Sequence, residues 1–283
     1  MSLKLLWLLA PCLLMAFGTG CQTGRYYSQA VRGQLQILTQ REPIRELIAR
    51  PDTPEELKEK LKLILELRAF AESELKLPVE DHYLRYVDLK RRFVVWNVHA
   101  APEFSTKPKT WWYPVVGRLK YRGYFSEEDA LDYAAGLQQK GYDVFVDGVE
   151  AYSTLGWFAD PVLNTFVHHP ESELAEILFH ELAHQRLFIS GDTDFNEAFA
   201  TAVGEEGVRR WLEAKGKLDD FARYRVAERR NEEFVRIVLN ARERLKALYG
   251  DSRHETTEPR SETEAERLRA QKKEIIARLR RDY

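Results

Sequence analysis

Residues 171–189 have the sequence ESELAEILFHELAHQRLFI, and this stretch decides the fold because the rest of the chain must surround its polar groups. Apolar residues such as Leu178 and Phe179 directly precede His180 and His184, which favours a helix that is partly buried. On a helix, residues four apart differ by about 40° around the axis and by one turn along it. The two imidazoles therefore face the same point and can share one metal ion.

Glu181 is the expected catalytic base of this H-E-x-x-H motif. It stands one position after His180, beside a shared metal but off the line of the ligands. From there its carboxylate can accept a proton from an attacking water, which is the chemistry of a metallopeptidase.

A third ligand is expected at Glu197, thirteen residues after His184. Residues 190–194 form turns, and a second helix is expected from Phe195 to about Ala214. A short helix-loop-helix returns the carboxylate to the two imidazoles.

Two histidines and one glutamate predict one zinc ion per chain, with the fourth tetrahedral position open as in catalytic sites. Thiolate ligands and a cysteine nucleophile are excluded, because the only cysteines are Cys12 and Cys21 near the N-terminus. The alternative is that the three polar residues are solvated on the surface. Their apolar neighbours argue against that alternative.

Outward from the motif, the preceding sequence predicts a small sheet. Strands are expected at residues 93–98, 113–116, 119–121 and 143–146, with a helix at 126–140. Residues 151–158 predict a strand that either lies at a sheet edge, where it could pair with an extended peptide, or packs inside the core. Further helices are expected at 26–47, with a break near Pro43, and at 218–248 and 264–281. Another helix is expected to begin after Thr53, which would cap it.

These elements predict an α+β fold that is mainly helical, with a small sheet before the H-E-x-x-H helix and N-terminal helices. We divide the chain into a leader (1–20), an N-terminal helical region (21–90), a zinc peptidase domain (91–250), and a polar linker with a charged helix (251–283) whose composition is compatible with disorder.

The leader is almost wholly apolar from Leu3 to Phe17 and ends in Gly-Thr-Gly before Cys21, which predicts a secretory signal. The span is shorter than the roughly 20 residues that a membrane helix needs. Small residues before a cysteine are similar to a bacterial lipobox, so we expect a lipid on Cys21 and, since Gln22 is not Asp, an outer-membrane location facing the periplasm. The alternatives are an uncleaved anchor and plain secretion.

The charge balance of 43 basic and 45 acidic residues, a net charge of −2, argues against nucleic acid as a partner. A peptide substrate and the membrane, through the lipid anchor, are the expected partners. The oligomeric state is left open.

Two short motifs carry a family resemblance. HELAHQ at 180–185 and NEAFA at 196–200 resemble the signatures of gluzincin aminopeptidases. With YSTLGWF at 152–158 and the lipobox, most of residues 21–250 resemble the bacterial family of predicted lipoprotein aminopeptidases. The resemblance implies a zincin-like domain and an envelope zinc peptidase, with His180, His184 and Glu197 as ligands and Glu181 as base.

An aminopeptidase is therefore the expected function. A zinc endopeptidase, a cell-wall peptide amidase, or a non-catalytic envelope lipoprotein on a peptidase scaffold are the alternatives. The gluzincin Gly-x-Met-x-Asn strand, which binds the substrate amine, is missing here. Glu150 is the nearest acid that could replace it, unless it is an exposed charge at a strand end.

Tyr152 and Tyr224 are the candidates for stabilising the oxyanion of the tetrahedral intermediate. Arg122 could bind a substrate carboxylate or form a salt bridge at the core edge. His168 and His169 are more typical of a capping or loop feature. Asp194 or Thr201 could orient an imidazole.

Overall fold

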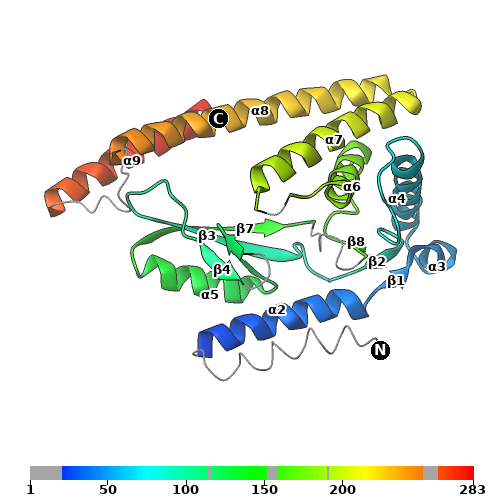
Figure 1. Ribbon diagram of the computed structural model, residues 1–283, viewed down its shortest axis with the longest axis horizontal. Helices are drawn as coiled ribbons and strands as arrows, with labels where there is room; N and C mark the ends of the chain where they lie inside the picture. The colour runs from blue at the N-terminus through cyan, green and yellow to red at the C-terminus, as the bar shows by residue number, and fades with distance from the viewer. Residues whose placement is uncertain (1–20, 114–116, 152–158, 190, 251–260) are drawn as a thin grey trace.

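The computed structural model describes residues 21–113, 117–151, 159–189, 191–250 and 261–283 (Figure 1). The predicted α+β fold class is confirmed, because helices dominate and the strands form small sheets. The helices are α2 (Cys21–Thr39), α3 (Ile44–Ala49), α4 (Glu55–Ser73), α5 (Glu127–Gln138), α6 (Glu171–Arg186), α7 (Thr193–Ala214), α8 (Leu218–Tyr249) and α9 (Glu262–Asp282). The strands are β1 (Glu42–Pro43), β2 (Arg85–Val87), β3 (Val95–Pro102), β4 (Trp111–Tyr113), β5 (Gly117–Leu119), β6 (Arg122–Tyr124), β7 (Tyr142–Val149) and β8 (Val162–Leu163).

The larger sheet has the antiparallel order β6-β3-β7, and its register runs from Val95 opposite Val149 to Pro102 opposite Tyr142. Successive side chains of a strand point to opposite faces. Trp96, Val98 and Ala100 are accordingly buried in a cluster with the apolar side of α5, which lies below the sheet in Figure 1. The other face of this sheet is the more exposed one.

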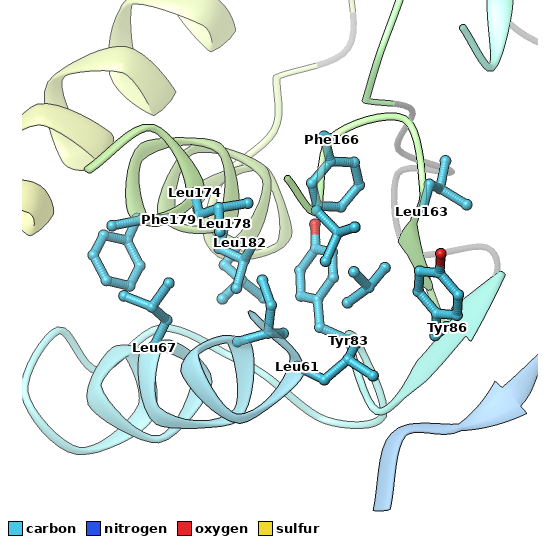
Figure 2. Close-up of a cluster of buried hydrophobic side chains, with 14 of the residues drawn as sticks. Leu61, Leu67, Tyr83, Tyr86, Leu163, Phe166, Leu174, Leu178, Phe179 and Leu182 are labelled. Atoms are coloured by element: carbon cyan, nitrogen blue, oxygen red, sulfur yellow. The ribbon is translucent and has the colours of Figure 1, made fainter. Parts of the chain in front are cut away.

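The main core lies between α4 and α6, as Figure 2 shows. Leucines of α4 meet a row of apolar side chains on α6, and the large side chains of this core include Leu61, Leu67, Leu174, Leu178, Phe179 and Leu182. All of these side chains are fully or almost fully buried. At roughly 1.5–3 kcal/mol for each large side chain, this burial is the main force that fixes α6.

The same cluster contains residues from Ile37 to Tyr224, so the predicted N-terminal region and the predicted peptidase domain share one core. The expected break near Pro43 is present: the N-terminal helix ends at Thr39, and β1 and α3 follow. The expected cap of α4 was wrong: Pro54 occupies the N-cap position without a side-chain hydrogen bond, and Thr53 is buried. No helix in the described part of the chain is long and apolar enough to cross a membrane.

The predicted C-terminal helix is present as α9, which lies against the end of α8 (Figure 1). Leu268 of α9 is buried with Phe104 and Tyr249. Arg269 pairs with Glu103 at 2.7 Å, which joins α9 to the end of β3. The expected strands at 113–116 and 151–158 lie largely outside the described residues.

The expected strand at 119–121 was placed wrongly. The chain forms β5 and β6 on either side, and Tyr121 lies in the turn between them. A turn is favoured there because β5 pairs with β4, whereas β6 pairs with β3 in the other sheet.

Two glycines allow α7 to approach α6 closely. A Cβ atom at Gly207 would lie 2.5 Å from Cδ2 of Phe179, and one at Gly204 would lie 3.3 Å from the backbone oxygen of Glu176. Contacts below 3.0 Å force a shift, and Phe179 is a fully buried side chain that has little room to move. Gly207 therefore sets the spacing between the two helices.

We expect Gly207→Ala to destabilise the protein. Overpacking a core costs about 1–3 kcal/mol, which exceeds the gain of up to about 1 kcal/mol from replacing a helical glycine by alanine. Urea unfolding measures the change. Gly136→Ala on α5 is the matched control, because its Cβ would meet nothing within 4 Å, and it should raise stability. Equal effects of the two substitutions would contradict the packing argument.

Candidate metal centre

Helix α6 presents His180 and His184 on one face, as the four-residue spacing predicts. Their Nε2 atoms lie 3.2 Å apart, and the two rings meet edge to face with centroids 4.9 Å apart. His184 is buried, whereas His180 is partly exposed. The opposite side of the helix is held in the core, so the two imidazoles are fixed in direction.

Asn196 holds the loop that leads into α7. Its side-chain oxygen accepts a hydrogen bond from the backbone N–H of Ile189, and its side-chain nitrogen donates to the carbonyl of the same residue, both at 2.8 Å. Asp192 caps α7 by accepting from the N–H of Phe195 at 3.1 Å. Because Asn196 is 2% exposed, these bonds are shielded from water and fix the start of α7 against the end of α6.

The residue after Asn196 completes the cluster. Glu197 places one carboxylate oxygen 3.3 Å from Nε2 of His180 and the other 3.7 Å from Nε2 of His184. Within the described residues, these three side chains form the one group that could hold a metal ion, with ligand atoms within 4.8 Å of one another. The structure thus brings together the three predicted ligands.

Burial lowers the pKa of both His180 and His184, although the nearby carboxylate of Glu197 acts in the opposite direction. Desolvation is the larger cause for each ring. A lowered pKa favours the neutral imidazole at pH 7, which is the form that binds a metal ion.

The donor set fits zinc, which takes imidazole nitrogen and carboxylate oxygen in a four-coordinate site. The other ring nitrogen of His184, Nδ1, is buried and has no hydrogen-bond partner among the described residues. Asp194 and Thr201, the expected orienting residues, are both exposed on α7.

Glu181, the predicted base, is half-buried on α6 beside the cluster. Tyr83 lies near it in the core, and Figure 2 shows the tyrosine ring beside α6 and below Phe166. Burial, followed by the charges of Glu181 and Asp160, raises the pKa of Tyr83 well above its usual value. Tyr83 is thus a neutral phenol beside the base, a neighbour that sequence reasoning missed.

The structure describes only one of the two expected oxyanion stabilisers, since Tyr152 lies outside the described residues. Tyr224 is 5% exposed on α8, and its surroundings are acidic. Burial raises its pKa, as do the charges of Glu176, Glu228 and Glu205. Tyr224 therefore faces an acidic cluster between α6, α7 and α8.

The other expected site residues have local partners. His169 lies between two carboxylates, 2.7 Å from Glu150 and 2.8 Å from Glu173, while His168 is exposed. The carboxylate of Glu150, at the end of β7, is therefore paired with His169. Arg122 stacks its guanidinium 3.9 Å from the ring centroid of Tyr26, which is a packing role at the core edge.

Tyr121 is a second residue that sequence reasoning missed. Burial and then the charge of Glu197 raise the pKa of Tyr121, which indicates that the phenol is near this carboxylate. The sequence offered no signal for this proximity, because Tyr121 lies in a turn between two sheets and is far along the chain from Glu197.

The fold and the cluster define an α+β protein with a two-histidine, one-glutamate site able to hold a divalent metal. A family model described as "Putative aminopeptidase" matches residues 25–283, so the chain belongs to this aminopeptidase family. Membership supports a peptidase. No curated protein and no solved structure gave a significant match to the chain.

Replacing Glu176 should change how stability depends on pH. Burial and the charges of Glu228 and Glu205 raise the pKa of Glu176 from 4.5 to about 7. Between these two pH values the native state holds a proton that the unfolded chain has lost, so stability falls as pH rises. Glu176→Gln removes this loss and should stabilise the protein by about 1–2 kcal/mol at pH 8, after allowing for partial exposure.

Thermal unfolding at pH 4 and pH 8 measures the effect, which should be present only at the higher pH. Glu266→Gln, at an exposed position on α9, is the control. A Glu176→Gln protein that is no more stable than the wild type at pH 8 would contradict the interpretation.

Proposed function

We propose that the protein is a zinc-dependent peptidase, and specifically an aminopeptidase. The observation that carries this proposal is that ligand atoms of His180 and His184 on α6 and of Glu197 on α7 lie within 4.8 Å of one another, with the carboxylate residue Glu181 next to His180 in the chain. Membership in an aminopeptidase family supports the peptidase class. The neutral form of the two imidazoles supports metal binding.

His180, His184 and Glu197 would hold the zinc, which when bound supplies Lewis-acid polarisation of the scissile carbonyl and acidifies a water. Glu181 takes the proton from the attacking water and delivers it to the leaving amine. Asn196 keeps Glu197 in place through its two hydrogen bonds to Ile189. The packed α6 helix holds both imidazoles and the base in one rigid frame.

The aminopeptidase assignment rests on the family rather than on a free acidic group, because Glu150 is engaged by His169. Cleavage-site mapping on peptides with free and acetylated N-termini distinguishes an aminopeptidase from an endopeptidase or a cell-wall amidase. Loss of cleavage on acetylation supports the aminopeptidase.

We place the protein in the bacterial envelope, attached to the outer membrane by a lipid on Cys21 and facing the periplasm. The apolar leader and the small residues before this cysteine support the placement. Metabolic labelling with a fatty acid tests it, and a Cys21→Ser chain that still carries the label would contradict it.

Glu181→Gln should lower kcat by about 10²–10⁴-fold, because the water loses its general base. Bound zinc should stay stoichiometric, since Glu181 is not a ligand. Hydrolysis of aminoacyl and internally quenched peptides gives kcat. Glu213→Gln is the control, because this carboxylate pairs with Arg209 on the exposed side of α7. Full turnover by the Glu181→Gln protein would rule out the mechanism.

Chelation should abolish turnover and lower the melting temperature, because a ligand that binds only the native state stabilises it. Zinc should restore both. In His184→Ala, which lacks a ligand, chelator and zinc should leave the melting temperature unchanged. A purified protein that holds no zinc, or that keeps full activity in chelator, would favour a metal-free function.

A further inference from the structure

Three aromatic rings form a row across the face of the β6-β3-β7 sheet that α5 does not cover. His99 of β3 is the register partner of Phe145 of β7, and the centroids of their rings are 6.3 Å apart. On the other side of His99, the ring of Tyr121 lies at 5.9 Å. The row therefore runs from Tyr121 through His99 to Phe145.

Two of the three rings are exposed, and His99 between them is partly exposed. Phe145 is 66% exposed and Tyr121 is 37% exposed. His99 is held in place by Asp147, whose carboxylate lies 2.8 Å from its Nε2. A contiguous group of aromatic side chains that are at least partly exposed, one of them beside a carboxylate, is typical of a binding surface.

The Tyr121 end of the row is near the candidate metal centre. Tyr121 lies within electrostatic range of Glu197. Glu197 is itself flanked by Phe195 and Phe199, whose rings are nearly parallel at 7° with centroids 6.3 Å apart. In Figure 1, α7 lies on the side of the sheet opposite α5, which is the side of the aromatic row.

The ring spacing matches an extended peptide. Residues in an extended chain advance by about 3.2–3.4 Å each, so side chains on the same face repeat at about 6.5 Å. The rings of the row repeat at 5.9 and 6.3 Å. A peptide lying along the row could therefore place alternate side chains against successive rings.

We propose that this aromatic row binds the part of a peptide substrate that lies beyond the scissile bond. The substrates are then oligopeptides with large apolar or aromatic side chains, rather than dipeptides. This inference rests on the proposed peptidase function. A nucleic acid is a poorer occupant, because Asp147 and Glu197 place carboxylates at the row.

Turnover of a length series tests the proposal. The zinc-loaded full chain is given peptides of two to six residues that carry either Phe or Ser at each position beyond the first. We expect kcat/KM to rise with length, and Phe at one or two distal positions to exceed Ser by about ten-fold. In Phe145→Ser, the ratio of kcat/KM for the best hexapeptide to that for the dipeptide should fall by about ten-fold.

Phe234→Ser on α8 is the matched control, since Phe234 is also an exposed aromatic residue, at 41%. It should leave the length series unchanged. Equal kcat/KM at all lengths, or the same length ratio in Phe145→Ser as in the wild type, would overturn the proposal.

Calorimetric binding to the zinc-loaded Glu181→Gln chain separates this inference from the proposed function. The same peptides should bind more tightly with distal Phe, and adding Phe145→Ser should weaken that binding by about ten-fold. If the wild type hydrolyses none of the peptides while this binding pattern holds, the peptidase function fails and the row remains a peptide site. If the peptides are hydrolysed but their binding does not depend on Phe145, the peptidase function stands and the proposed role of the row in peptide binding is refuted.

Discussion

The close approach of α7 to α6 is the constraint on which the candidate site depends. Two imidazoles on one helix need a third ligand from elsewhere, and Glu197 reaches them only because α7 begins beside the end of α6. Gly204 and Gly207 remove the side chains that would hold the two helices apart. Asn196 then fixes the connecting loop through its two buried hydrogen bonds. The close spacing of α6 and α7 and the side-chain amide of Asn196 thus place the carboxylate of Glu197 3.3 Å from His180.

Burial lowers the pKa of these two histidines, the charge of Glu197 raises it, and burial has the larger effect. A carboxylate so close would by itself favour the protonated ring, yet desolvation is the larger influence on the pKa of both histidines. His184 is buried and His180 is partly buried where α6 packs in the protein. The core therefore fixes the directions of the side chains and also keeps the imidazoles in the form that can bind a metal.

Local spacing explains which parts of the site could be predicted. His180 and His184 are one helical turn apart, and Glu197 follows a loop too short to lead far away. Tyr121 could not be found in this way, because it approaches Glu197 only through the register of β6 with β3. The hold of Asn196 on Ile189 also depends on a loop conformation that composition does not specify. The α+β class was predictable from periodicity, whereas the boundaries at Thr39 and around Tyr121 depended on pairing between distant segments.

The C-terminal helices explain why the family match continues to residue 283. The sequence alone suggested a polar segment apart from the domain. In the structure, α8 follows α7 through a turn at Gly216, where φ is +68° and a side chain would be strained. Helix α9 then reaches β3 through Glu103 and β7 through the pair of Lys272 with Asp143. One continuous helical layer therefore connects the helix that carries Glu197 to the sheet that carries the aromatic row. Both ion pairs lie at the end of the sheet where Pro102 is opposite Tyr142, so α9 holds this end of the sheet against α8 and belongs to the architecture that surrounds the site.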